Sequence, residues 1–162
     1  YRHYEVTTPG FKYNMTDVQA ALGLHQPDRI EASWERRREI WARYDQAFEN
    51  LPLELPARPS DPESRHALHL YILRVRLEDV RCTRDDVLSA LQAENIGCGV
   101  HYRGIHVQPW YRDTYGLTTE QFPHATRATD TTFSIPLSSK LSDADVDDVI
   151  EAVSKVMRAY AS

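Results

Sequence analysis

The sequence predicts an α+β fold in which helices pack on a small, mostly antiparallel sheet. Segments whose apolar residues recur every three or four positions are mixed along the chain with segments of strand-like alternation. The strand-like segments are short, whereas a doubly wound fold would extend them. With 162 residues, of which 41% are hydrophobic and 27% charged, the chain has the size and composition of one globular domain with a real core.

Composition also narrows the classes of partner. No apolar run approaches the roughly 18 residues needed to cross a bilayer, and the first five residues hold no apolar signal segment. We therefore expect a soluble, cytoplasmic protein without a membrane partner. A formal net charge of -5 disfavours nucleic acid as a ligand. The two cysteines, Cys82 and Cys98, are too few for a disulfide scaffold and are expected to be plain thiols.

The N-terminal part predicts a loop followed by a helix. Thr16 and Gln19 have the spacing of a capping box, in which the Thr16 hydroxyl accepts a hydrogen bond from the Gln19 amide. A helix should therefore start near Asp17, and Pro27 should break it or open a new one.

A long amphipathic helix is predicted from Asp28 to about Asn50. Its large apolar residues recur at spacings of three, four and seven: Ile30, Trp34, Trp41, Tyr44 and Phe48. Arg36, Arg37 and Arg38 lie among glutamates at helical spacing, which favours a solvated face of mixed charge.

The next segments predict a connector, a strand and a helix. Four prolines between Leu51 and Ser64 indicate an exposed connector: Pro52, Pro56, Pro59 and Pro62. Alternation from His66 to Arg76 predicts a strand covered at least in part on both faces. Thr83 and Asp86 resemble another N-terminal cap, and the helix that follows should stop at Gly97.

The C-terminal half predicts two strands and two helices. Cys98 to Tyr102 should form a second strand, and 104–116 reads as a turn-rich aromatic segment. A short helix starting at Pro123 should precede a strand at 133–137. Ser142 and Asp145 should cap the last helix, whose apolar stripe comprises Val146, Val149, Ile150, Val153 and Met157.

Two segments hold polar and aromatic residues that packing alone does not require. The first, 10–17, leads into a helix N-terminus, where Lys12 and Asn14 add donors suited to an anion. The second, 101–111, follows a predicted strand, and Arg103 could bind a phosphate or carboxylate there. The alternatives are a plain capped helix with a solvated Lys12 and a surface loop with anchoring aromatics.

A metal site is not expected. His66 and His69 are three apart on a predicted strand, so their side chains point to opposite faces and cannot readily share an ion.

At these two segments the chain resembles the DegT/DnrJ/EryC1/StrS aminotransferases, pyridoxal-phosphate enzymes that aminate keto-sugars on nucleotides. The block 9–23 carries the resemblance first, and the later blocks follow in the family's order: His69–Tyr71, Gly99–Arg103, His106–Pro109, Phe122–Ala125 and Ser134–Leu137. The sequence of these blocks most resembles the branch that makes UDP-4-amino-4-deoxy-arabinose.

The resemblance implies the C-terminal small domain of a fold-type I pyridoxal-phosphate aminotransferase. Residues 1–26 would be a loop and helix that join a large domain lying outside this chain, and 27–162 would be the small domain. The intact enzyme would be a homodimer that transfers an amino group from glutamate to a nucleotide-linked keto-sugar.

Site residues follow only from the resemblance. Asn14, with Lys12 and Tyr13 beside it, would reach the cofactor phosphate of the neighbouring subunit. His101, Tyr102, Arg103 and His106 would line the sugar-nucleotide pocket.

No catalytic residue is expected in this chain. Its only lysines, Lys12, Lys140 and Lys155, do not match the family's cofactor-bearing lysine, so the chain alone should not transaminate. The alternative function is a stand-alone, non-catalytic binding or interaction module.

Overall fold

The computed structural model describes residues 5, 7–58, 60–61 and 63–162. The chain divides into two compact units, one ending at Ser33 and one running from Trp34 to Ser162, and the division falls within helix α2 (Pro27–Phe48). Of the connector prolines, Pro59 and Pro62 lie outside the described residues. In the part that is described, no helix combines the length and hydropathy that crossing a membrane requires.

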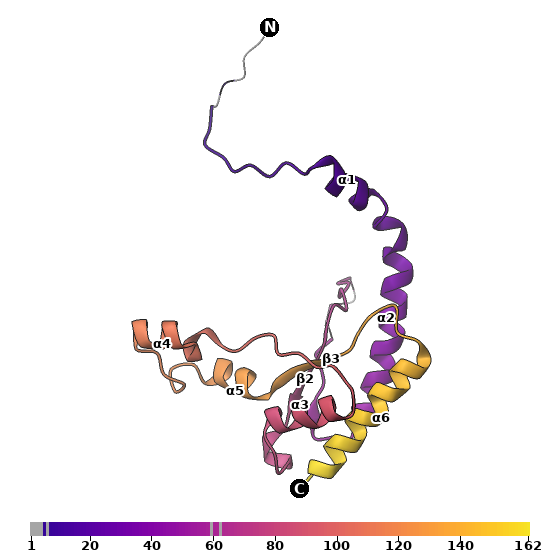
Figure 1. Ribbon diagram of the computed structural model, residues 1–162, viewed down its shortest axis with the longest axis vertical. Coiled ribbons are helices and arrows are strands. Elements are labelled where there is room, and N and C mark those ends of the chain that lie inside the picture. Colours follow the sequence, from indigo (N-terminus) through magenta and orange to yellow (C-terminus); the bar gives the residue numbers. More distant parts are fainter. Residues whose placement is uncertain (1–4, 6, 59, 62) are drawn as a thin grey trace. The chain divides into compact units, whose positions relative to one another are not determined.

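The first unit contains helix α1 (Asp17–Leu24) and the extended segment before it (Figure 1). The predicted capping box is confirmed: the Gln19 amide donates to the Thr16 hydroxyl at 3.3 Å, and the Thr16 amide donates to Gln19 Oε1 at 3.0 Å. No side chain of α1 is buried. The helix is therefore held by its local cap and not by a core of its own.

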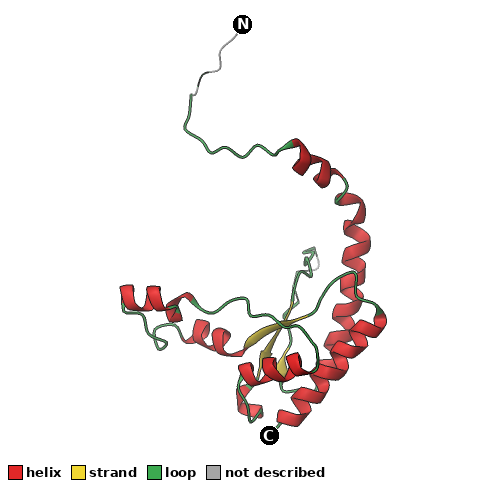
Figure 2. Ribbon diagram, viewed as in Figure 1, coloured by secondary structure: helices red, strands yellow, loops and turns green. Residues whose placement is uncertain are grey.

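The second unit is built on a three-stranded antiparallel sheet, which confirms the predicted α+β class. Its strands are β1 (Leu53–Glu54), β2 (Tyr71–Val75) and β3 (Thr132–Ile135), in the spatial order β1-β2-β3 (Figure 2). The register pairs Leu53 with Val75 and Tyr71 with Ile135.

One face of this sheet forms the core, because residues on alternate positions of paired strands share a face. Buried side chains of that face come from all three strands: Leu53, Tyr71, Leu73, Val75, Phe133 and Ile135. The opposite face carries Glu54, Ile72, Arg74, Thr132 and Ser134, of which Arg74 is exposed and Ile72 half-buried. The prediction of a partly covered second face therefore holds for β2.

The described residues form six helices and two short 3₁₀ turns in all. Beyond α1 and α2 they are η1 (Leu77–Asp79), α3 (Arg84–Ala93), η2 (Ile105–Val107), α4 (Pro109–Tyr115), α5 (Pro123–Thr131) and α6 (Asp143–Tyr160). The predicted caps at Thr83 and Ser142 are confirmed as full capping boxes with Asp86 and Asp145. Buried residues of α2, α3 and α6 complete one continuous core with the inner face of the sheet.

Ion pairs join α2 to α6, which lie side by side in Figure 1. Arg36 donates to Asp143 at 2.8 Å and to the Leu141 carbonyl at 2.9 Å. Arg43 donates to Asp143 at 2.9 Å and also pairs with Asp147. The sequence-based assignment of a solvated arginine face is thus wrong for Arg36, which bridges two helices.

The prediction of an exposed connector between Leu51 and Ser64 is wrong for its first residues. Leu51, Pro52 and Leu53 are buried, and Leu53–Glu54 forms the edge strand β1. Proline tolerates this place because the Pro52 carbonyl still accepts the Arg76 amide, at 3.1 Å, and an edge strand can spare one donor.

The predicted strand at 98–102 is reduced to a single bridge between Gly99 and Ser134. The strand expected from His66 begins only at Tyr71, since Leu68 adopts a left-handed backbone with φ 50°. The helix expected to run to Gly97 ends at Ala93. There Asn95 takes the left-handed position, and the Ile96 amide bonds the Leu91 carbonyl at 2.9 Å.

The turn-rich segment 104–116 contains a helix that the sequence analysis did not predict. Pro109 opens α4 at its first turn, and Gly116 closes it with φ 62°. Proline at a helix start and glycine just past its end are a recognised pair of signals, which the aromatic residues between them obscured.

Acid should destabilise the second unit through its caps. Hydrogen bonds from the Thr83 hydroxyl and backbone amide lower the pKa of Asp86, and those from Ser142 lower the pKa of Asp145. A folded-state pKa below the unfolded value stabilises the fold above that value, and this stabilisation is lost as pH falls through the folded pKa. We expect the urea concentration at the unfolding midpoint to decrease when the pH is lowered below about 4. Asp86→Asn should flatten that fall, and the exposed Asp148→Asn should not; equal profiles for the two variants would contradict this explanation.

Candidate functional site

The first predicted segment leaves its polar groups free. Tyr13 is 86% exposed, and Lys12 and Asn14 are exposed beside it. Among the described residues, no hydrogen bond or ion pair involves Lys12 or Asn14. Because the Thr16 hydroxyl already accepts the Gln19 amide and Asp17 adds a negative charge, the helix end alone is a poor anion site. Lys12 and Asn14 are thus the donors that this segment offers.

The same unit exposes large apolar side chains. Phe11 is 85% exposed, and large fractions of Met15, Val18 and Leu22 are also accessible. The rings of Phe11 and Tyr13 contact each other at 5.7 Å but nothing covers them within the unit. Apolar exposure on this scale is typical of a surface that meets another protein segment.

The second predicted segment follows a bridge to the edge strand β3. Gly99 and Ser134 exchange two backbone hydrogen bonds, at 3.0 and 2.8 Å. The His101 Nε2 then lies 2.9 Å from the Ser134 hydroxyl. The Ser134 hydroxyl donates a hydrogen bond to the Gly99 carbonyl at 3.4 Å. Its oxygen can therefore accept a hydrogen bond from the imidazole N–H of His101. His101 is therefore held in place by the sheet.

His106 is buried in the structure, at 5% exposure. Its Nε2 lies 2.9 Å from the Thr126 hydroxyl, which donates to the Thr119 carbonyl at 3.0 Å, and its ring contacts Phe122 at 5.3 Å. This arrangement joins η2 to α5. The residue is well placed to position the segment, while its assignment to the substrate stays a prediction.

Tyr102 and Arg103 are both exposed. Tyr102 is 84% exposed, and its ring lies 5.3 Å from that of His101. In the described part of the chain, Arg103 has neither a hydrogen bond nor an ion pair. It borders a hollow of about 360 Å³ whose lining also includes His106, Arg112 and Thr118. Because Arg112 pairs with Asp113 at 2.8 Å, Arg103 supplies the unengaged guanidinium.

Gly104→Ala should destabilise the fold around this segment. A Cβ at Gly104 would lie 2.6 Å from both the His106 ring and the Thr129 hydroxyl, which accepts the Gly104 amide at 2.9 Å. Overpacking of this kind costs roughly 1–3 kcal/mol. Urea unfolding should report that loss, whereas Gly97→Ala, whose Cβ would meet nothing within 4 Å, serves as the matched control. Equal stabilities of the two variants would show that the Gly104 packing is loose.

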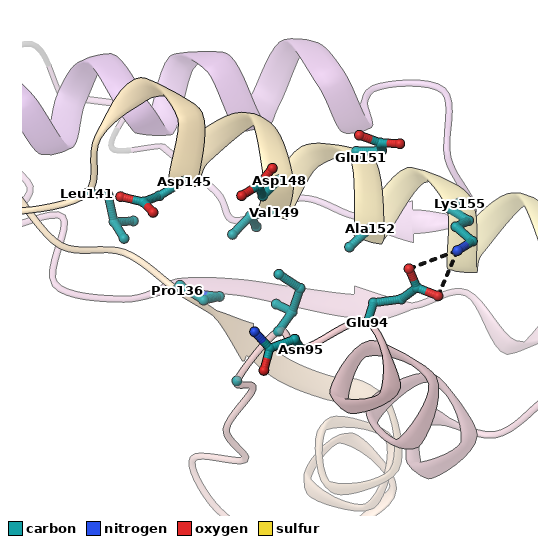
Figure 3. A pocket seen from close by; sticks show the side chains of 12 residues that line it. Glu94, Asn95, Pro136, Leu141, Asp145, Asp148, Val149, Glu151, Ala152 and Lys155 are labelled. Atoms are coloured by element: carbon teal, nitrogen blue, oxygen red, sulfur yellow. Dashed lines mark hydrogen bonds and ion pairs between the residues drawn. The ribbon is translucent and has the colours of Figure 1, made fainter.

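A second hollow, of about 460 Å³, lies between α6 and the loop after α3 (Figure 3). Its lining includes four carboxylates and one lysine, and the carboxylates are Glu94, Asp145, Asp148 and Glu151. The one lysine there, Lys155, donates to both Glu94 oxygens at 2.8 Å. The negative charge disfavours phosphates at this place.

The sequence analysis missed three hydroxyl residues that support the second segment: Thr126, Thr129 and Ser134. Thr126 and Thr129 lie three apart on the helix predicted from Pro123, so they share a face, and this spacing was a usable signal.

Over the described residues, no cluster of three or more metal-ligating side chains occurs. His66 Nδ1 accepts the Leu68 amide at 3.1 Å.

The fold is of the α+β class, and the two predicted segments display exposed polar side chains. Residues 1–154 match the DegT/DnrJ/EryC1/StrS aminotransferase family, and the chain belongs to this family.

Relatives extend over much more sequence than this chain. The spore coat polysaccharide biosynthesis protein SpsC of Bacillus subtilis is 43% identical over 157 residues, which are 96% of this chain and 40% of that protein. An uncharacterised protein of Methanocaldococcus jannaschii is 37% identical over 155 residues, with the same coverage. The chain therefore spans about two fifths of the length of these relatives.

Solved structures agree with the fold. The putative sugar aminotransferase Spr1654 from Streptococcus pneumoniae, in its PLP-form, superposes with a TM-score of 0.83 at 32% identity, over 99% of this chain and 40% of that one. The aminotransferase TlmJ from Streptoalloteichus hindustanus gives 0.78 at 30% identity, over 97% and 40%. These neighbours are fold-type I aminotransferases, so the predicted fold class is confirmed.

Proposed function

We propose that this chain forms the C-terminal part of a pyridoxal-phosphate-dependent enzyme that transfers an amino group from glutamate to a nucleotide-linked keto-sugar. The family match over residues 1–154 carries the proposal. Two relatives support a carbohydrate substrate by their names, a spore coat polysaccharide biosynthesis protein and a putative sugar aminotransferase. Within this proposal, residues 1–26 join the chain to a large domain and 27–162 form the small domain.

The donors of the first segment fit the phosphate of the cofactor. A lysine ammonium and an asparagine amide, both exposed and without partners in the described chain, are the groups that bind a phosphate through charge and hydrogen bonds. When bound, pyridoxal phosphate supplies an electron sink and a temporary carrier of the amino group. We assign Lys12 and Asn14 to the phosphate, with Tyr13 beside them, in a neighbouring subunit of a homodimer.

The residues of the second segment would bind and orient the sugar nucleotide. Arg103 has a free guanidinium that can pair with a diphosphate or a carboxylate in two parallel hydrogen bonds. Tyr102 offers an exposed ring to a sugar or base. His101 and His106, fixed by Ser134 and Thr126, would hold these two residues in position. A uridine diphosphate 4-keto-pentose, the substrate of the arabinose branch, is the finer proposal.

We expect the chain on its own to self-associate. Phe11, Met15, Val18 and Leu22 are exposed in the structure, and a second chain or a large domain could bury them. Sedimentation velocity should show a concentration-dependent dimer or larger species. Replacing Met15 and Val18 by serine should shift the population toward monomer, while the same change at the exposed Ile105, in the second unit, should not. A strict monomer at all concentrations would contradict the assignment of this surface.

A direct test of the proposal is the coding sequence that precedes Tyr1. An aminotransferase large domain with its cofactor-bearing lysine should be encoded there. A start codon immediately before Tyr1 would instead identify a stand-alone, non-catalytic module.

A further inference from the structure

Arg37 lies on the core-facing side of α2, although its neighbours in sequence are polar. It precedes Ile40, Trp41 and Tyr44 by three, four and seven residues, and these spacings place all four on one face of a helix. Ile40, Trp41 and Tyr44 are exposed by 2% or less. Arg37 itself is half-buried. The sequence-based expectation of a solvated face is therefore wrong for this residue as well.

The guanidinium of Arg37 has no acceptor in the described chain. Its Nε is buried without a hydrogen-bond partner, and none of its nitrogens takes part in an ion pair there. The arginines on either side differ, since Arg36 bonds Asp143 and the Leu141 carbonyl, and Arg38 pairs with Glu35. Of the three guanidinium nitrogens of Arg37, only Nε is both buried and without a partner. The two terminal nitrogens are therefore accessible to an incoming group.

The second orphan donor of the described residues lies one helical turn away. The indole Nε1 of Trp41 is also buried without a partner, and the Trp41 ring is fixed edge-on against Tyr71 at 4.9 Å and His66 at 5.3 Å. Residues four apart on a helix have their side chains about 5–6 Å from each other at the Cβ atoms. The two buried side-chain donors without a partner in the described chain thus lie four residues apart on α2.

A buried or half-buried guanidinium without an anion is costly, and native proteins pair such groups. From this geometry we infer that Arg37 anchors a carboxylate-binding site, whose carboxylate comes from outside the described residues. Arginine favours a carboxylate because the planar fork of the guanidinium matches its two oxygens.

Two sources share this chemistry. One is the amino donor, glutamate, in which case the inference rests on the proposed function; the other is an acidic side chain of a segment beyond this chain.

The first experiment uses the 162-residue chain and glutarate, a dicarboxylate that cannot donate an amino group. At about ten times its dissociation constant, glutarate should raise the Tm of the wild type by about 3–6 °C relative to chloride at equal ionic strength. Arg37→Met should lose this response and, without ligand, should melt no lower than the wild type. Arg38→Met is the matched control, because Arg38 is exposed and pairs with Glu35; it should keep the response.

A spectroscopic measurement keeps the test independent of whether the methionine variant folds. The Nε–H signal of Arg37 in ¹⁵N-labelled wild type, assigned by its loss in Arg37→Lys, should shift on addition of glutarate. A wild type that shows neither a Tm rise nor a shift of this signal, or a response that survives in Arg37→Met, would overturn the inference.

The full-length protein distinguishes the two sources. If glutamate is the ligand, Arg37→Lys should raise the KM for glutamate about 10- to 100-fold and leave the KM for the sugar nucleotide unchanged. If a protein carboxylate is the ligand, both constants should stay unchanged and Tm should fall by several degrees. A full-length Arg37→Met that equals the wild type in Tm and in both constants would contradict both. The glutarate result does not depend on amino transfer, so it can succeed even if the proposed function fails.

Discussion

The 162-residue chain alone should show no glutamate-dependent amino transfer, even with excess pyridoxal phosphate. Each of its three lysines is unsuited to carry the cofactor. Lys155 donates to both oxygens of Glu94 at 2.8 Å, and Lys140 and Lys12 are exposed on the surface. All three lysines are exposed, so none lies in a desolvated pocket of the kind that activates a lysine nucleophile.

Borohydride trapping with peptide mapping is the measurement for this first prediction. We expect only scattered, substoichiometric labelling of Lys12, Lys140 and Lys155 and no turnover of glutamate. Lys140→Arg and Lys155→Arg variants control for surface labelling. One stoichiometric adduct at a single lysine, together with turnover, would contradict the assignment of the cofactor-bearing lysine to another part of the enzyme.

In the full-length enzyme, Asn14→Ala and Arg103→Ala should weaken different ligands. Asn14 is uncharged and is assigned to the cofactor phosphate, so its loss should weaken cofactor retention about ten- to a hundred-fold. That figure corresponds to roughly 1.5–3 kcal/mol for one hydrogen bond to a charged group. Arg103, exposed and without a partner in the described chain, should instead affect the KM for the sugar nucleotide.

Cofactor affinity and the KM for the sugar nucleotide need to be measured for both variants. Arg158→Ala, which removes an exposed arginine on α6, controls for the general loss of positive charge. A cofactor defect in the Arg103 variant, or a pure substrate defect in the Asn14 variant, would show that the two segments had been assigned to the wrong ligands.

The features that the sequence predicted correctly are local ones. The three capping boxes at Thr16, Thr83 and Ser142 depend on residues three apart, and all three form. The apolar stripe of the last helix is buried as predicted except for the half-buried Ile150. Short-range spacing therefore determined where these helices begin and which side faces the core.

The features that the sequence did not predict depend on distant partners. Leu53–Glu54 becomes a strand only because Val75 and Arg74 lie opposite, which four nearby prolines gave no reason to expect. The burial of His106 follows from Thr126, twenty residues away. Arg37 is a different case: local helical spacing to Ile40 and Tyr44 indicated the core-facing side, whereas its charge suggested solvent.

Transfer of ¹⁵N from labelled glutamate is the measurement that tests the proposed function most directly. The full-length protein, loaded with pyridoxal phosphate, would be mixed with [¹⁵N]glutamate and a uridine diphosphate 4-keto-pentose or a related keto-sugar nucleotide. Our proposal predicts that ¹⁵N appears in the amino group of the sugar and that 2-oxoglutarate forms in equal amount. Cofactor-loaded protein that leaves all of the ¹⁵N in glutamate with every keto-sugar nucleotide offered would contradict it.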